Sequence, residues 1–181
     1  MPRLAAVLTS HDIPAAELGA MRLDGEVYAL ADGWCPVDEF EGPAQRAVGV
    51  LGERSPRLIA ELGTAAWIWG VAPTLPRRIE FCVDLGSRAR LLSSPLVRVR
   101  ELVLDADDRV AFAGAAVTSP LRTAVELARV RDVLSKDEET AIVALSRLGG
   151  FGLTDCHALL DRRRNLPEKR RAAVRLGVLL S

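Results

Sequence analysis

The sequence contains few of the side chains on which enzyme active sites usually depend. Histidine occurs twice, as His11 and His157, and lysine occurs twice, as Lys136 and Lys169. His157 directly follows Cys156, so on a helix the two side chains diverge by about 100° and cannot form a nucleophile–base pair. The sequence thus offers no catalytic residues, and we expect a protein that is not an enzyme.

Metal and cofactor patterns are also missing. The three cysteines, Cys35, Cys82 and Cys156, are odd in number and widely spaced, which fits neither a disulfide framework nor a zinc site. No glycine-rich phosphate loop follows an expected strand. We therefore expect no metal and no cofactor.

Long apolar runs are absent too. The first residues, "MPRLAAVLTSHD", contain an apolar run too short for a signal-peptide core, and no stretch approaches the length of a transmembrane helix. We expect a cytoplasmic protein without membrane contact.

Charge is balanced overall but unevenly distributed. Residues 10–61 contain ten acids and four bases, for −6, whereas residues 162–175 contain seven bases and one acid, for +6. The candidate nucleic-acid-binding residues are six of these bases: Arg162, Arg163, Arg164, Lys169, Arg170 and Arg171. Three interpretations stay open for the cluster: a solvated helix face, contact with DNA phosphates, or attraction to the acidic N-terminal region.

Turn and cap residues predict the order of the elements. Residues 1–38 read as a small unit, with a helix ending near Gly25 and a hairpin that turns at Asp32-Gly33. The next helix has Pro43 in its first turn. A further helix is expected over 55–63, with Ser55 as its N-cap, and a short one over 65–69, capped by Thr64.

Two of the three tryptophans, Trp67 and Trp69, lie on that short helix, although aromatic residues make up 4% of the chain. On a helix they point about 200° apart, which predicts a wedge buried between two layers. A platform that stacks nucleic-acid bases is disfavoured because no basic residue lies between Gly63 and Pro76.

The remaining chain alternates apolar and polar residues and then becomes helical. Strands are expected over about 77–118, including a hairpin that turns at Gly114, and helices over about 119–180. Helix starts are indicated at Ser119-Pro120, at the Ser135–Glu138 capping box, at Thr154 and at Pro167. This order predicts an α+β fold with a small mixed or antiparallel sheet and a C-terminal helical bundle.

Arg122 contradicts a local rule, because a cation is disfavoured in the first turn of a helix. A specific carboxylate partner is therefore expected. Glu126, four residues later, is the local candidate, and Glu80 or Asp84 from the sheet are the distant ones. Glu80 and Asp84 lie on one strand face, but a structural role is favoured over a nuclease site.

Three segments together resemble the actinobacterial-type AbiEi family of antitoxins and transcription regulators. They are "TAAWIWG" (64–70), the strand patterns that follow it, and "GAAVTSPLRTAVELAR" (114–129). Thr118, Pro120, Arg122 and Thr123 match the family's helix start, and Glu126 stands where the family usually has Asp. With Trp67 and Trp69, the four matching residues are expected to have structural roles.

The resemblance implies a degenerate winged-helix-like segment over 1–38 and an AbiEi-like α+β domain over 39–181. It further implies an antitoxin or transcription regulator, with DNA and a nucleotidyltransferase-like toxin as possible partners. Residues 1–38 lack the basic side chains of a DNA-binding winged helix, since Arg3 and Arg22 face four acids before residue 27. A protein-interaction scaffold without nucleic acid and a degenerate nuclease-related protein stay open as alternatives.

Overall fold

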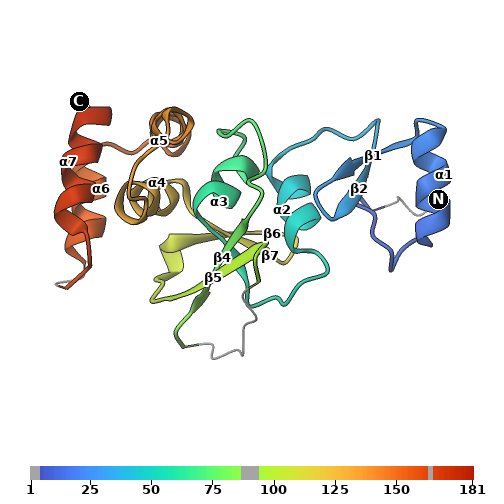
Figure 1. Ribbon diagram of the computed structural model, residues 1–181, viewed down its shortest axis with the longest axis horizontal. Coiled ribbons are helices and arrows are strands. Elements are labelled where there is room, and N and C mark those ends of the chain that lie inside the picture. Colours follow the sequence, from blue (N-terminus) through green and yellow to red (C-terminus); the bar gives the residue numbers. More distant parts are fainter. Residues whose placement is uncertain (1–4, 87–93, 163–164) are drawn as a thin grey trace.

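The computed structural model describes residues 5–86, 94–162 and 165–181. The molecule is elongated, with the N-terminal helix at one end, a sheet in the middle and the C-terminal helices at the other end (Figure 1). Small sheets thus lie between two helical regions, and the α+β class expected from the sequence is confirmed.

The N-terminal region consists of α1 (Ala15–Leu23) and a hairpin of β1 (Val27–Leu30) and β2 (Gly33–Pro36). Leu8 adds an isolated antiparallel bridge to Trp34. Leu8, Leu18 and Val27 form a small core under this hairpin. The helix and the hairpin agree with the sequence prediction, but the turn lies one residue earlier than expected, at Ala31-Asp32, because Gly33 already pairs with Leu30.

Helix α2 (Pro43–Leu51) joins the N-terminal region to the main sheet, and Pro43 lies in its first turn as expected. The approach is close, because a Cβ atom on Gly49 would lie 2.6 Å from the carbonyl oxygen of Leu30. Asp32 N also donates to Gly49 O at 3.0 Å. Val7, Leu30 and Cys35 therefore share one core with Val50 of α2 and with the sheet.

The main sheet has five strands in the order β5-β4-β3-β7-β6. Their bounds are β3 (Ile59–Ala60), β4 (Ile79–Asp84), β5 (Val97–Leu102), β6 (Arg109–Phe112) and β7 (Ala115–Thr118). The β3–β7 and β4–β5 pairs are parallel, and the β3–β4 and β6–β7 pairs are antiparallel. The sheet is therefore mixed. Ala113 and Gly114 both have positive φ, 48° and 89°, as a two-residue hairpin turn requires.

The helix expected over 55–63 is wrong. Ile59 and Ala60 instead form the central strand, where Ile59 pairs with Cys82 on one side and with Ala116 on the other. Both residues are fully buried, so hydrogen bonds to two distant strands and burial outweigh the local Ser-Pro helix signal.

Helix α3 spans Leu62–Ile68, whereas the sequence predicted a helix over 65–69 with Thr64 as its N-cap. The helix therefore begins three residues earlier than expected and ends one residue earlier. The Thr64 hydroxyl does not cap a helix; it accepts a hydrogen bond from Glu80 N at 2.8 Å and thereby ties α3 to β4. Trp67 packs into the core shared with α2 and the sheet, and Leu62 and Ala66 pack into a second core among the C-terminal helices. Helix α3 thus lies between two cores.

The C-terminal bundle contains α4 (Pro120–Val130), α5 (Lys136–Gly149), α6 (Leu153–Asp161) and α7 (Lys169–Leu179). Ser119 caps α4, and the Ser135–Glu138 capping box opens α5, as expected. Thr154 does not cap α6. The helix begins at Leu153, one residue before Thr154, and Gly152 is its N-cap. Helix α4 packs against α3, α5, α6 and α7 and is the centre of the bundle.

Candidate functional site

A buried network of charged side chains joins the sheet to α4. It contains three cations and three anions, and its formal charge is therefore zero: Arg100, Arg122, Arg129, Glu61, Asp108 and Glu126. The side chains come from β5, from α4, from the residue before α3 and from the short 3-10 turn at Ala106–Asp108. The network holds these segments of the chain at fixed distances from one another.

Glu126 is the centre of this network. Its carboxylate is 1% exposed and contacts Arg129 at 2.6 Å, Arg100 at 3.0 Å and Arg122 at 3.1 Å. Arg100 additionally donates to both oxygens of Glu61, with 2.7 Å from its Nε to Oε1. Burial without such partners would strongly disfavour each charge, so every member of the network depends on the others.

Arg122 has two carboxylate partners. The expected pair with Glu126 is present, but the second partner is Asp108, at 3.0 Å, and not Glu80 or Asp84. Glu80 is occupied by Arg131, whose two terminal nitrogens donate to its carboxylate at 2.7 Å each. Asp108 could not be predicted as this partner, because it lies 14 residues before Arg122 on a separate element and its carboxylate also caps its own short turn at Asp105 N.

The surroundings shift the carboxyl pKa values in opposite directions. Burial raises the pKa of Glu61 above its ordinary value, although Arg100 acts against this shift. Burial also disfavours the charged form of Glu126, but the charges of Arg122, Arg129 and Arg100 outweigh it and lower its pKa. Burial raises the pKa of the nearby Cys82 thiol, which keeps it protonated and unreactive.

The other residues of the expected family signature lie at the start of α4. Trp69 Nε1 donates to Thr118 O at 2.9 Å, and the Thr118 and Thr123 hydroxyls are 2.7 Å apart. Thr123 Oγ1 also lies 2.9 Å from Ser119 O, and Pro120 is the first helical residue. These contacts join the end of α3, β7 and α4.

Three of the candidate nucleic-acid-binding residues contact other parts of the protein. Arg162 lies 3.5 Å from Asp105, Lys169 lies 2.5 Å from Asp161, and Arg171 donates to Arg129 O at 2.9 Å. Arg170 is exposed and pairs with none of the described side chains. Arg163 and Arg164 lie outside the described residues.

Arg175 of α7, which no sequence pattern singled out, joins α7 to the end of α4. Its guanidinium donates to the carbonyl oxygens of Ala128, Arg131 and Asp132 at 2.6–3.0 Å. These carbonyls are at the C-terminal end of α4, where helices leave acceptors unsatisfied and favour a cation. Arg171 and Arg175 thus join α7 to the C-terminal end of α4, and α1 lies at the other end of the molecule (Figure 1). The described bases of residues 162–175 that have partners contact residues between 105 and 168, and attraction to the acidic N-terminal region stays a prediction.

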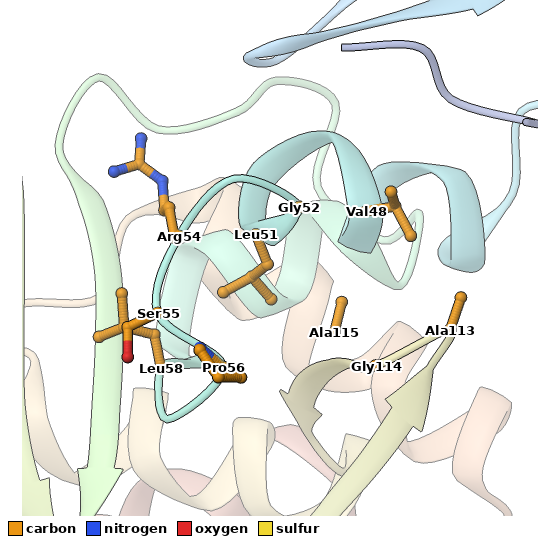
Figure 2. Close-up of a pocket in the computed structure, with 10 residues that line it drawn as sticks. All are labelled: Val48, Leu51, Gly52, Arg54, Ser55, Pro56, Leu58, Ala113, Gly114 and Ala115. Atoms are coloured by element: carbon orange, nitrogen blue, oxygen red, sulfur yellow. The ribbon is translucent and has the colours of Figure 1, made fainter. Parts of the chain in front are cut away.

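A cavity of about 290 Å³ lies between the C-terminal end of α2 and the β6–β7 turn. Figure 2 shows its lining: Val48, Leu51, Gly52, Arg54, Ser55, Pro56, Leu58, Ala113, Gly114 and Ala115. The Arg54 guanidinium points away from the apolar side chains in Figure 2 and pairs with Asp32 at 2.5 Å. The lining residues include no set of titratable side chains that converge on the cavity, as a catalytic site would require.

The described residues also contain no group of three or more His, Cys, Asp or Glu side chains that could hold a metal ion. Among the helices that the structure describes, none has the length and apolarity needed to cross a membrane.

The comparisons with known proteins agree with the fold. The family model of the AbiEi antitoxin C-terminal domain matches residues 58–181, from just before β3 to the end of the chain. The crystal structure of the Rv2827c protein from Mycobacterium tuberculosis superposes with a TM-score of 0.51 and 16% identity, over 97% of this chain and 71% of that one. No curated protein sequence matches the chain. The likeness to the solved structure concerns the fold alone.

Proposed function

Since this chain belongs to the AbiEi antitoxin family, we propose that it neutralises a protein toxin by binding it, without catalysis. The observation that carries this proposal is the family match, which includes the sheet and all four helices of the C-terminal bundle. In the buried network, the charged side chains pair with one another and hold β5, α4 and the start of α3 together. They have this structural role in place of a catalytic one, which is consistent with a protein that acts by stoichiometric binding.

The partner that we propose is a nucleotidyltransferase-like toxin encoded beside this chain. Co-expression of the two proteins tests this directly, with growth of the host as the measurement. We expect the toxin alone to stop growth, and the toxin together with this chain to permit it. The purified proteins should then elute together in size-exclusion chromatography. A toxin that stays active beside the folded chain would contradict the proposal.

Binding without catalysis has its own signature. A binding antitoxin should restore growth only when it is at least equimolar to the toxin, so a titration of purified toxin activity should reach its end point near a one-to-one ratio. An enzyme that inactivates the toxin would act at a small fraction of that amount.

A second candidate function is transcription regulation through DNA contact at the basic residues that follow α6 and at those of α7. Its support is Arg170, which is exposed and unpaired among the described residues, beside the half-buried Lys169. Phosphate binding should weaken with salt, with a log–log slope of about −0.9 per neutralised phosphate. Arg170→Gln should therefore flatten the slope by about one unit, whereas Arg147→Gln on α5, also exposed, should leave it unchanged. Equal slopes for the two variants would exclude this surface.

A further inference from the structure

Three well-exposed valines of the C-terminal bundle surround one hollow of its surface. Val133 is 82% exposed, Val174 is 69% exposed and Val178 is 77% exposed. All three line a hollow of about 320 Å³, to which Leu134 and Leu179 also contribute. Scattered apolar residues on a surface need no explanation, but a group of them around one hollow marks an interaction site.

A second hollow, of about 360 Å³, lies beside the first along α5. The linings of the two hollows share Glu139 and Leu179, so together they form one continuous surface over α5, α7 and the loop between α4 and α5. We call this surface the α5–α7 groove. Its part on α5 consists of Lys136, Glu139, Thr140, Val143, Ala144 and Arg147.

Charges of opposite sign lie at equal distances from Val143 on this helix. Glu139 is four residues before Val143 and Arg147 is four residues after it, so the three side chains lie on one face of α5. Arg147 is exposed and pairs with none of the described residues. Among the described side chains, the Glu139 carboxylate pairs with the 91% exposed Lys136, at 3.2 Å. Such an exposed pair contributes little, so Glu139 and Arg147 are both available to a second molecule.

A second copy of this chain has the surface that matches this arrangement. If two α5 helices cross antiparallel at Val143, a two-fold axis passes between the two valines, and each Glu139 faces Arg147 of the other copy. The contact would contain two equivalent ion pairs around an apolar centre. Antiparallel crossing also brings the N-terminal end of each helix toward the C-terminal end of the other, which the helix dipoles favour.

We propose that the α5–α7 groove joins two copies of this chain in a symmetric dimer, with α5 crossing α5 at Val143. The inference is independent of the proposed function, because the chain's own surface supplies both sides of the contact. A standard interface contains about 20–30 residues a side, more than line the two hollows, so we expect a weak dimer with a dissociation constant on the order of micromolar.

Sedimentation velocity of the full chain, from low to high micromolar concentration, tests the ion pairs. Glu139→Arg alone and Arg147→Glu alone each place like charges against each other, so each should weaken dimerisation by about tenfold or more. The double variant restores opposite charges and should recover the wild-type dissociation constant. The matched control is Glu17→Arg, since Glu17 is also an exposed acid in the first turn of a helix, but α1 lies at the other end of the molecule (Figure 1).

A disulfide tests where the axis lies. Val143→Cys should link two chains on mild oxidation, because a disulfide needs Cα atoms within about 7 Å and the two side chains meet at the axis. The native cysteines are free and buried, so they should not react. Leu148→Cys is the control, because Leu148 is 54% exposed on the same helix but lies about 7.5 Å along it from the crossing.

The outcomes decide the proposal without the toxin. A wild-type chain that stays monomeric at every concentration overturns it. A dimer that survives both single reversals, or that the double variant does not restore, forms through another surface and also overturns it. Failure of Val143→Cys to link the chains of a wild-type-like dimer contradicts the crossing at Val143. Helix content equal to wild type in circular dichroism establishes that the variants fold, and growth rescue from the toxin remains a separate measurement of the proposed function.

Discussion

Replacing Glu126 with glutamine tests whether the buried charge network stabilises the fold. The substitution keeps the shape of the side chain but removes the negative charge that Arg100, Arg122 and Arg129 share within 3.1 Å. Three buried cations would then face two carboxylates, leaving one uncompensated positive charge. Removing one partner from a buried ion pair typically costs about 3–5 kcal/mol, and we expect a loss of that size in the free energy of unfolding.

The matched control is Glu139→Gln. Glu139 pairs with Lys136 at 3.2 Å on the surface of α5, and the Lys136 side chain is 91% exposed. Exposed pairs contribute about 0–1 kcal/mol, so this variant should unfold almost as wild type does.

Urea denaturation followed by tryptophan fluorescence at neutral pH measures both variants. We expect the Glu126→Gln midpoint to fall with little change in the slope m, because the surface exposed on unfolding stays the same. For a domain of this size, the loss corresponds to a melting temperature lower by about 6–20 °C. If Glu126→Gln and Glu139→Gln differ by less than about 1 kcal/mol, the charge of Glu126 does not stabilise the fold through the buried network.

Three further predictions concern packing, capping and pH. Gly49→Ala should destabilise the protein by about 1–3 kcal/mol, because the new Cβ would lie 2.6 Å from Leu30 O. Gly19→Ala should instead stabilise it by about 0.5–1 kcal/mol, because nothing lies within 4 Å of its new Cβ. Chemical denaturation of both variants checks that the two effects have opposite signs. Arg175→Gln should cost about 1–3 kcal/mol in the same assay by leaving carbonyls of α4 unsatisfied, and an unchanged midpoint would refute this role. The pKa of Glu126 is lowered in the folded state, so its charge stabilises the fold above its ordinary pKa of 4.5, and this stabilisation is lost as the pH falls from there through the lowered pKa. Unfolding measured from pH 7 to 3 should therefore show a shallower acid decline in Glu126→Gln. The raised pKa of Glu61 has the opposite sign, and because the charge of Glu126 contributes to it, that shift should be smaller in the variant.

The site could be predicted from the sequence only where its contacts are local. The pair of Arg122 with Glu126 follows from a spacing of four residues on one helix, and the structure contains it at 3.1 Å. The pairs of Arg122 with Asp108 and of Arg100 with Glu61 join separate elements, and no spacing rule predicts them. Two expectations stay predictions: the contact of the bases within residues 162–171 with DNA, and the boundary between the two expected domains.

The sequence by itself determined the elements whose signals lie within a few residues of one another. The caps at Ser119 and Ser135, the turn at Gly114 and the alternation along β4 each depend on contacts within one turn, one hairpin or one strand face. Only the tertiary structure decided that Ile59 and Ala60 form the central strand. A strand of two residues has little stability of its own, and here it exists because β4 and β7, distant in the chain, supply its hydrogen bonds and its burial together.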